Sequence, residues 1–412
     1  MTIYYVTPEG TNTTTAHDWA NSCNITHLKT TLSPTLQSGD SVLLSAKAGE
    51  NVYFTKDAIY LPVSFSGTAI SRSEFKVGGH YTSEDVSNGG TRNTIPIIGL
   101  MQYPWVSANG AGPWDQFGVL GSYINVQGMN IMHGRFGIVI DAAASFVNIA
   151  DTSLFNLDEG IDISGTDANI EKVNAKSIRK NAIRVRDGAD RATIQHFYID
   201  GDNMTGTPNP NGIIVESADN VSLKHGYIFN YDFTLTTDAY IQGDGITINS
   251  GSNDTLIEDV HIKGTTDRGI DSKSNRTKII GCSVVDTKLG IGVWSNTENL
   301  IIASTVARIR AVRNDGCCIQ NMGKVTLVNC HLSSGTSYNS LTNNGTILLC
   351  EVGAKQLYMV GGSIETDGVV PIAILKSAGS SVHLVNVNIN GVLVTQSYVH
   401  SGSESYERWS PS

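Results

Sequence analysis

The stretch DGITINSGSNDTLIEDVHIKGTTDRGIDSKSNRTKIIGCSVVDTKLGIGVWSN, residues 244–296, contains one short pattern three times. DGITIN (244–249), RGIDSK (268–273) and LGIGVW (289–294) each have Gly-Ile at the second and third positions. In DGITIN and LGIGVW apolar residues recur at every second position, and in RGIDSK Ser272 follows Ile270 at the second of these places. Such period-2 alternation, rich in Ile, Val and Thr, is typical of β-strands rather than helices. The stretch therefore predicts equivalent strands that recur once per repeat.

The same pattern extends beyond this stretch. Five further segments align with it: FGIVID (136–141), EGIDIS (159–164), NAIRVR (181–186), NGIIVE (211–216) and DGCCIQ (315–320). The residue shared by all eight segments is glycine, or alanine once, and it lies at Gly137, Gly160, Ala182, Gly212, Gly245, Gly269, Gly290 and Gly316. The steps between these positions range from 21 to 33 residues. We interpret them as a base period of about 22 residues lengthened by insertions, which is too short for helical repeats.

Asparagines mark the turns after several of these strands, at Asn220, Asn253, Asn275 and Asn296. Asparagines stacked ~4.8 Å apart at equivalent corners can hydrogen-bond along the stack. Repeats of three short strands, each paired with the coils above and below, define a parallel β-helix. We therefore predict an all-β fold of about ten or more coils.

The chain is expected to divide into four segments. Residues 1–49 would form the first coil and an N-terminal capping helix, read from WANSCNITHLKTTL (19–32). Such a helix would cover the unpaired edge of the stack. Residues 50–118 read as irregular coils and loops, residues 119–395 as the regular β-helix, and residues 396–412 as a polar tail.

Composition excludes several classes of function. The formal net charge is −10 and no Lys/Arg-rich run exists, so a nucleic-acid partner is not expected. No run of 18 apolar residues is present to span a membrane. The start, MTIYYVTPEG, lacks the features of a secretory signal, so we expect an extracellular protein whose signal has been removed, or a virion-associated one released by lysis. The six cysteines are expected to be buried free thiols.

In strands of the GIDIS type the isoleucines should face the interior and the alternate residues solvent. The outward residues then form one elongated face with acids, arginines, a lysine and a tryptophan, and insertions at 201–211, 230–243, 306–315 and 335–345 would wall it into a groove. Such a groove suits a sugar chain, with aromatic side chains such as Tyr231 offering stacking surfaces. The predicted substrate-binding residues are Glu159, Asp162, Arg184, Arg186, Tyr240, Asn249 and Trp294.

A family resemblance supports this fold. The opening YYVTPEGTN…W…L…SGDSVLL and the coils after it resemble the right-handed parallel β-helix proteins of the pectin-lyase-like superfamily, over about residues 3–395. The resemblance implies a right-handed coil and a polysaccharide partner. It does not choose a reaction, because the superfamily includes lyases, hydrolases, epimerases and phage tailspike depolymerases. It leaves both a monomer and a homotrimer open.

Part of the repeat region is similar to the chondroitinase B and alginate lyase family. In GIDSKSNRTKIIGCSVVDTKLGIGVWSN (269–296), Lys273 matches that family's catalytic base. The family's proton-donating arginine is replaced by Trp294, and its acidic calcium ligands by Thr266 and Arg268. The guanidinium of Arg268 would then neutralise the uronate carboxylate in place of the metal.

Hydrolysis is the alternative reaction. YIQGDGITINSG (240–251) resembles the QDDCIAINSG segment of polygalacturonases, with Asp244 at one catalytic acid. Gly243 replaces the paired aspartate and Arg268 the family's histidine, so that mechanism is disfavoured. Asp244 and Asp267, on adjacent coils, would suit an inverting pair of carboxylates. An epimerase, or a non-catalytic carbohydrate-binding spike, stays open.

We predict a depolymerase that cleaves an acidic, uronate-containing exopolysaccharide by β-elimination. The candidate catalytic residues are Glu216, Asp244, Asp267, Arg268, Asp271 and Lys273. No cofactor is required in this mechanism. Calcium, bound by oxygens of Asp244, Asp267 and Asp271, is the alternative.

Overall fold

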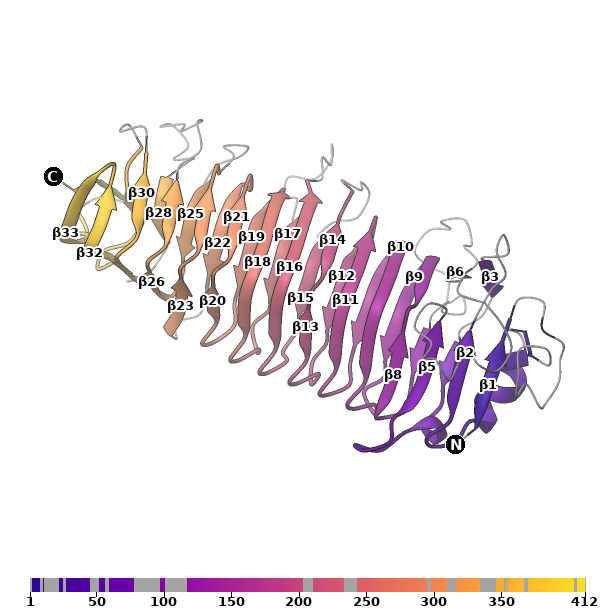
Figure 1. Cartoon of the computed structure of the whole chain (residues 1–412). Coiled ribbons are helices and arrows are strands. Elements are labelled where there is room, and N and C mark those ends of the chain that lie inside the picture. Colours follow the sequence, from indigo (N-terminus) through magenta and orange to yellow (C-terminus); the bar gives the residue numbers. More distant parts are fainter. Residues whose placement is uncertain are drawn as a thin grey trace. The chain divides into compact units, whose positions relative to one another are not determined.

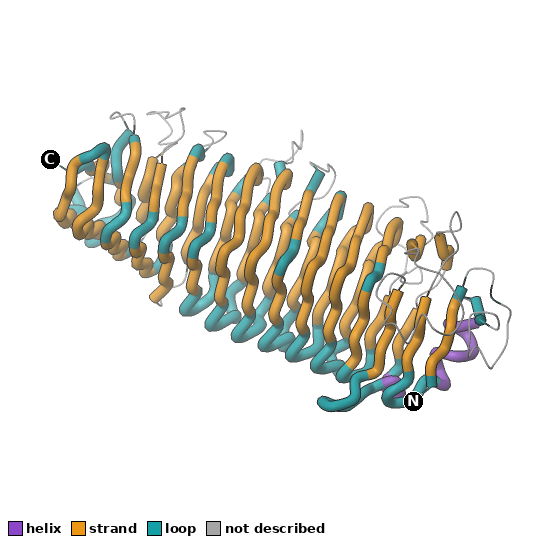
Figure 2. The backbone as a smooth tube through the Cα atoms, in the orientation of Figure 1, coloured by secondary structure: helices purple, strands orange, loops and turns teal. Residues whose placement is uncertain are grey.

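The computed structural model describes residues 2–7, 10, 22–24, 27–44, 52–55, 59–77, 97–100, 117–202, 210–232, 243–294, 298–309, 316–333, 346–351, 353, 355–366, 370–403 and 406–411. Nearly all of the regular structure in these residues is β-strand (Figures 1 and 2). The chain divides into two compact units, Met1–Ile199 and Asp200–Ser412, and the division falls within β14 (Tyr198–Asp200). Each unit is described by itself.

The first unit contains three series of parallel strands. The first series is β1 (Ile3–Val6), β2 (Ser41–Leu44), β5 (Ser73–Val77), β8 (Ile124–Gln127), β10 (Asn148–Ile163), β11 (Asn169–Lys176) and β13 (Thr193–Gln195). The second is β3 (Val52–Thr55), β6 (Ile97–Leu100) and β9 (Asn130–Ile140). The third is β4 (Ile59–Leu61), β7 (Phe117–Val119), the C-terminal parts of β9 and β10, and β12 (Asn181–Val185).

The second unit, described by its own strands, also contains three series of parallel strands, here called walls A, B and C. Wall A is β15 (Asn211–Val215), β17 (Asp244–Ile248), β19 (Arg268–Ser272), β22 (Leu289–Val293), β25 (Cys317–Asn321), β28 (Thr346–Cys350) and β31 (Ala373–Leu375). Wall B is β16 (Ser222–Tyr231), β18 (Leu256–Thr265), β20 (Lys278–Ile280), β23 (Glu298–Ile302), β26 (Lys324–Val328), β29 (Gln356–Val360) and β32 (Ser381–Ile389). Wall C includes β21 (Ser283–Val285), β24 (Thr305–Ala307), β27 (His331–Ser333) and β30 (Ser363–Glu365). These pairings confirm the predicted parallel β-helix.

A ladder of aliphatic side chains forms the core behind wall A. Its members are in register on successive coils and fully buried: Ile213, Ile246, Ile270, Ile291, Ile319 and Leu348. Complete burial of such a side chain contributes about 1.5–3 kcal/mol. The Gly-Ile pattern therefore marks the inward position correctly.

The repeated glycine is required by close approach between coils. A Cβ atom at Gly269 would lie 2.2 Å from Val284 Cγ1 and 3.0 Å from the carbonyl oxygen of Gly290. At Gly290, a Cβ atom would lie 2.3 Å from the carbonyl oxygen of Cys318. The next coil thus occupies the space of a side chain, and only hydrogen fits there.

The prediction that Gly316 is the last shared glycine is wrong. Ile291 pairs with Ile319 and Gly292 pairs with Gln320, so Cys318 takes the position of the glycines. Stacking of Ile319 on the isoleucine ladder fixes this register. The small side chain of Cys318 is accommodated because its Sγ donates to the carbonyl of Ser333 at 3.4 Å. The alignment from sequence was therefore two residues off in this coil.

The asparagine ladder is confirmed in part. Asn275 Nδ2 donates to Asn253 Oδ1 at 3.0 Å, and Asn253 Nδ2 donates to Asp219 Oδ1 at 2.9 Å. The next member of the ladder is thus Asp219 rather than Asn220. Asn220 is exposed and has a left-handed backbone, with φ 58°. Asn296 lies outside the described residues.

The N-terminal region differs from its prediction. The capping helix is not seen: in the described residues the region has a single π-helical turn, Leu28–Leu32, and a 3-10 turn, Ser33–Thr35. A third short turn, also 3-10, is Val63–Phe65. Residues 50–118, expected to be irregular, contain β3–β6 and the start of β7, which pair with later coils. The loop at 78–93 lies outside the described residues.

The C-terminal residues are strands rather than a loose tail. β33 (Val392–Val399) pairs antiparallel with β32, and β34 (Glu407–Trp409) pairs antiparallel with β31. The six cysteines are all buried free thiols, as predicted. Among the described helices, none is long and apolar enough to cross a bilayer.

We predict that Gly269→Ala lowers the free energy of unfolding by about 1–3 kcal/mol, because the new methyl group overpacks against Val284. Urea unfolding measures the loss. Val284→Ala removes the Cγ1 atom against which the new methyl group would clash. The double variant Gly269→Ala/Val284→Ala should therefore lose less stability than the sum of the losses of the two single variants. Strict additivity would contradict the proposed contact.

Candidate functional site

The glycine in each repeat also determines which polar side chains share a face. In the ladder between β15 and β17, Asn211 pairs with Asp244 and Ile213 with Ile246, and the two glycines between them are left out. The break in alternation puts the residue before the glycine on the same face as the residue three positions later. Asp244 Oδ2 consequently lies 3.1 Å from Thr247 Oγ1. One coil on, Arg268 Nε lies 3.5 Å from Asp271 Oδ1.

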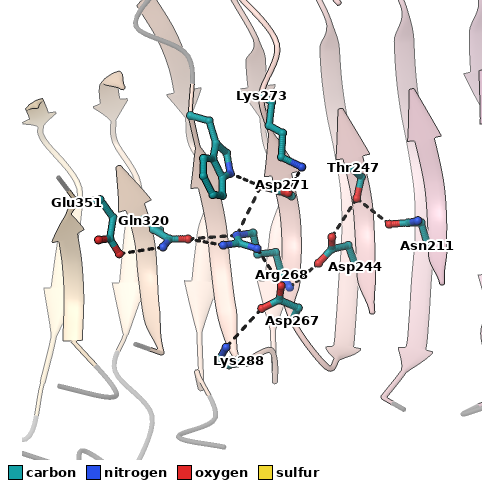
Figure 3. Close-up of polar contacts among 11 residues, drawn as sticks. Asn211, Asp244, Thr247, Asp267, Arg268, Asp271, Lys273, Lys288, Gln320 and Glu351 are labelled. Carbon is teal, nitrogen blue, oxygen red and sulfur yellow. Dashed lines mark hydrogen bonds and ion pairs between the residues drawn. The ribbon is translucent and has the colours of Figure 1, made fainter. Parts of the chain in front are cut away.

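Arg268 is the centre of a buried polar network on wall A (Figure 3). Its Nη1 donates to Asp267 Oδ2 at 2.9 Å, and its Nη2 donates to Gln320 Oε1 at 2.8 Å. Its backbone N–H donates to Asp244 Oδ1 at 2.8 Å. Gly292 leaves room for the guanidinium, since a Cβ atom there would lie 2.8 Å from Arg268 Nε. The arginine thus links strands β17, β19 and β25.

Asp271 holds the two most accessible members of the network. Its Oδ1 accepts a hydrogen bond from Trp294 Nε1, and its Oδ2 lies 2.9 Å from Lys273 Nζ. Lys273 Nζ also lies 5.7 Å from the centre of the Trp294 ring, and the guanidinium carbon of Arg268 lies 5.4 Å from it. The indole and the ammonium group are therefore fixed side by side above a buried carboxylate.

Asp244 lies on the other side of Arg268. The pKa of its carboxyl is raised from 3.8 to about 7, mainly by burial and in addition by the charges of Asp267 and Asp271, whereas Arg268 lowers it in part. The hydrogen bonds agree with a neutral acid. Thr247 Oγ1 is 2.7 Å from Asn211 Oδ1 and has only one hydrogen, so after donating to Asn211 it can accept from protonated Asp244.

The network continues to later coils through Gln320. Gln320 Nε2 donates to Glu351 Oε1 at 3.1 Å, and Lys376 Nζ lies 3.2 Å from Glu351 Oε2. Lys288 Nζ lies 3.6 Å from Asp267 Oδ1. These four residues were not predicted from the sequence. Because the alignment of DGCCIQ was two residues off, Gln320 was not recognised as the residue that aligns with Gly292. The other three residues lie outside the Gly-Ile segments.

Solvent reaches Lys273 and Trp294 more than the three aspartates of this network. Asp244, Asp267 and Asp271 are 2%, 1% and 1% exposed. The side chain of Lys273 is 31% exposed, and Trp294 is 37% exposed. The prediction that the outward acids face solvent is therefore wrong, because on this wall charged neighbours cover one another.

A second polar cluster lies in the first unit. Asp162 is bound by Arg186 through two hydrogen bonds of 2.5 Å each. Glu159 Oε2 lies 3.4 Å from Arg184 Nη1. Burial raises the pKa of the Glu159 carboxyl, and the charge of Arg184 lowers it in part. The structure thus brings these four predicted binding residues together, but as ion pairs.

Of the remaining predicted residues, Asn249 and Glu216 occupy the position of Lys273 on the two preceding coils, and Tyr240 lies outside the described part of the chain. Glu216 and Asn249 follow β15 and β17 and are partly exposed. Most of the insertions expected to wall a groove also lie outside the described residues. Tyr231, expected to offer a face to sugars, is fully buried, because β16 turns it into the core.

The three aspartates do not form a calcium site in this arrangement. Each accepts from or is paired with an N–H group of Arg268, so a cation would compete with the guanidinium. Within the described residues, no group of three His, Cys, Asp or Glu side chains is placed to hold a metal ion.

Comparisons with known proteins agree on the fold. No protein-family model and no curated protein matches the chain by sequence. By structure it is similar to pectate lyase Pel9A, with 13% identity, 86% of this chain and 79% of that chain covered, and a TM-score of 0.50. It is also similar to a variant of the periplasmic alginate epimerase AlgG, with 11% identity, 89% and 83% covered, and a TM-score of 0.53. These likenesses show the right-handed parallel β-helix fold that the sequence resemblance implied.

We predict that Asp244 makes the protein less stable as pH rises. Between its ordinary pKa of 3.8 and its folded pKa of about 7, the native state binds the extra proton. The free energy of unfolding therefore falls as pH rises through this window. Asp244→Asn mimics the neutral acid and should remove a fall on the order of 2–3 kcal/mol between pH 5 and 7, at 1.36 kcal/mol per pH unit.

Urea unfolding at pH 5 and pH 8 measures this difference. Asp254→Asn is the matched control, because its hydrogen bond to Arg276 lowers the pKa of Asp254 and its contribution is lost only on acidification. Equal pH slopes in the wild type and Asp244→Asn would show that Asp244 is ionised throughout.

Proposed function

We propose that this protein depolymerises an acidic, uronate-containing polysaccharide by β-elimination, with Lys273 as the base that accepts the proton. The fold is one that it shares with a pectate lyase and an alginate epimerase. Pectate and alginate are both acidic polysaccharides. The side chains of wall A support elimination as the reaction and Lys273 as the base.

The observation that carries the proposal is that Lys273 is accessible, whereas the three aspartates of the network are enclosed. Hydrolysis of a glycosidic bond requires two carboxylates that reach the sugar, at about 5–9.5 Å from one another. Asp244 and Asp267 are each buried to 98% or more, and Asp267 is already neutralised by Arg268 and Lys288. Elimination requires one accessible base, and Lys273 is accessible. The geometry therefore supports elimination better than hydrolysis.

In the proposed β-elimination, Lys273 acts on the C5–H bond of the uronate. After its ammonium group has lost a proton to solvent, Lys273 accepts the proton from C5 of the uronate, and the electron pair of that C–H bond forms the C4–C5 double bond. The C4–O bond breaks, and the departing sugar oxygen takes a proton from water. Lys273 returns its proton to solvent before the next cycle.

The role first predicted for Arg268 changes. Its guanidinium is 5% exposed and bound to Asp267 and Gln320, so it does not reach a substrate carboxylate. We assign it instead to holding Asp271, and through Asp271 the exposed pair Lys273 and Trp294. Trp294 offers the ring on which a sugar can stack.

Two substitutions at Lys273 separate binding from catalysis. Lys273→Arg retains a cation that does not act as a base at neutral pH, so we expect nearly unchanged affinity and a rate lower by about 10²–10⁴. Lys273→Gln should lose both affinity and rate. The measurement is the ultraviolet absorbance of the new double bond on a panel of pectate, alginate, hyaluronate and chondroitin, with affinity from titration calorimetry.

Lys278→Gln is the matched control, because Lys278 is an exposed lysine on wall B. A Lys273→Arg variant with full activity would overturn the assignment of the base. New reducing ends without the absorbance would indicate hydrolysis. Binding without cleavage of any polymer would indicate a carbohydrate-binding protein instead.

A further inference from the structure

One outward column on wall A carries a second accessible lysine. The backbone N–H groups of Lys273, Trp294, Met322, Glu351 and Lys376 each donate to the residue that precedes the equivalent position one coil earlier. These five residues are therefore the same position on five successive coils. Their side chains share one side of the wall, at the strand ends of β19, β22, β25, β28 and β31.

The two lysines are held in the same manner. Lys273 pairs with the buried Asp271, which lies against Arg268. Lys376 pairs with Glu351, which accepts from the buried Gln320. Gln320 in turn accepts from Arg268, so both lysines are attached to one continuous network. Each amine has a fixed partner below it and remains accessible, at 31% and 24%.

Between the two lysines the column presents Trp294 and Met322, followed by Glu351, whose carboxylate is paired with Lys376. Trp294 is exposed and Met322 is partly exposed. Four coil steps separate Lys273 from Lys376, which is ~19 Å at ~4.8 Å per coil. A single sugar unit is too short to reach both amines, whereas a short oligosaccharide is long enough. The sugar rings would pass over the indole and the thioether.

We infer that Lys376 is a second anion-binding point for an acidic oligosaccharide whose other end is bound by Lys273 and Trp294. This inference deepens the proposed function and rests on the assignment of an acidic polysaccharide as ligand. It predicts that affinity depends on chain length, with a gain once the oligosaccharide carries carboxylates far enough apart to reach both lysines.

The test uses the full chain and galacturonate, mannuronate and glucuronate-containing oligosaccharides of two to eight units, with affinity measured by titration calorimetry. We expect the wild type to gain affinity between short and long members of at least one series. Lys376→Gln should weaken binding of the long members about tenfold, the factor that 1.4 kcal/mol represents, and leave binding of the shortest members unchanged. Lys278→Gln, which removes an equal charge from wall B, should change neither.

Equal affinity of Lys376→Gln and the wild type for every length would overturn the inference, as would equal weakening for short and long members. Absence of binding to all three series would overturn both the inference and the acidic substrate. Binding is measured separately from cleavage. If Lys376→Gln loses affinity only for long oligosaccharides and the wild type forms no double bond, Lys376 is supported as an anion-binding point and the elimination is refuted.

Discussion

Parallel pairing between successive coils is the constraint on which the rest of this structure depends. It places each residue of a strand against the residue of the same rank one coil away, as Ile246 lies against Ile270 and Ile270 against Ile291. A choice of side chain at one position is therefore a choice about its neighbours about 22 residues earlier and later. Both the isoleucine core and the polar network on wall A follow from this rule, one on each side of the same strands.

The polar network is held together by the position of a single guanidinium. Removing charges from water costs several kcal/mol per ion, and only good geometry with further hydrogen bonds compensates for that cost. Arg268 achieves this by contacts to Asp267, Asp271 and Gln320 together. The network does not need Asp244 to be charged, and its raised pKa allows it to remain neutral. The site thus combines a buried, hydrogen-bonded network with two accessible side chains above it, Lys273 and Trp294.

The sequence was sufficient for the fold and for most of the site because both are periodic. Residues aligned by Gly-Ile, such as Asp244, Arg268 and Asp271, do meet in space, together with Lys273 and Trp294. Prediction failed where the period was interrupted. The insertion before β25 hid the register of Cys318 and Gln320, and only the stacking of Ile319 on Ile291 fixes it. Glu351 and Lys376 were missed because their coils lack the glycine that served as the marker.

The alternation of residues along the strands did not predict how deeply the outward side chains are buried. Alternation separates the two sides of a strand, but it does not say whether the outer side is covered. On wall A the outer acids are covered by Arg268, and in the first unit Asp162 is covered by Arg186. The consequence is chemical, because a carboxylate that is enclosed by a guanidinium does not act on a sugar. The candidate chemistry therefore shifts from the acids, which the sequence emphasised, to the lysine beside them.

The reversal of direction at β33 has a consequence for assembly. A stack of parallel strands has two unlike ends, and each end matches the other end of a second copy, so repeated head-to-tail addition would build an open filament. β33 runs against β32, and β34 runs against β31. A copy arriving at this end meets strands of opposite polarity, and the pattern of donors and acceptors it needs is no longer there. A parallel coil therefore cannot be added to β31 and β32 along the edges that β34 and β33 occupy.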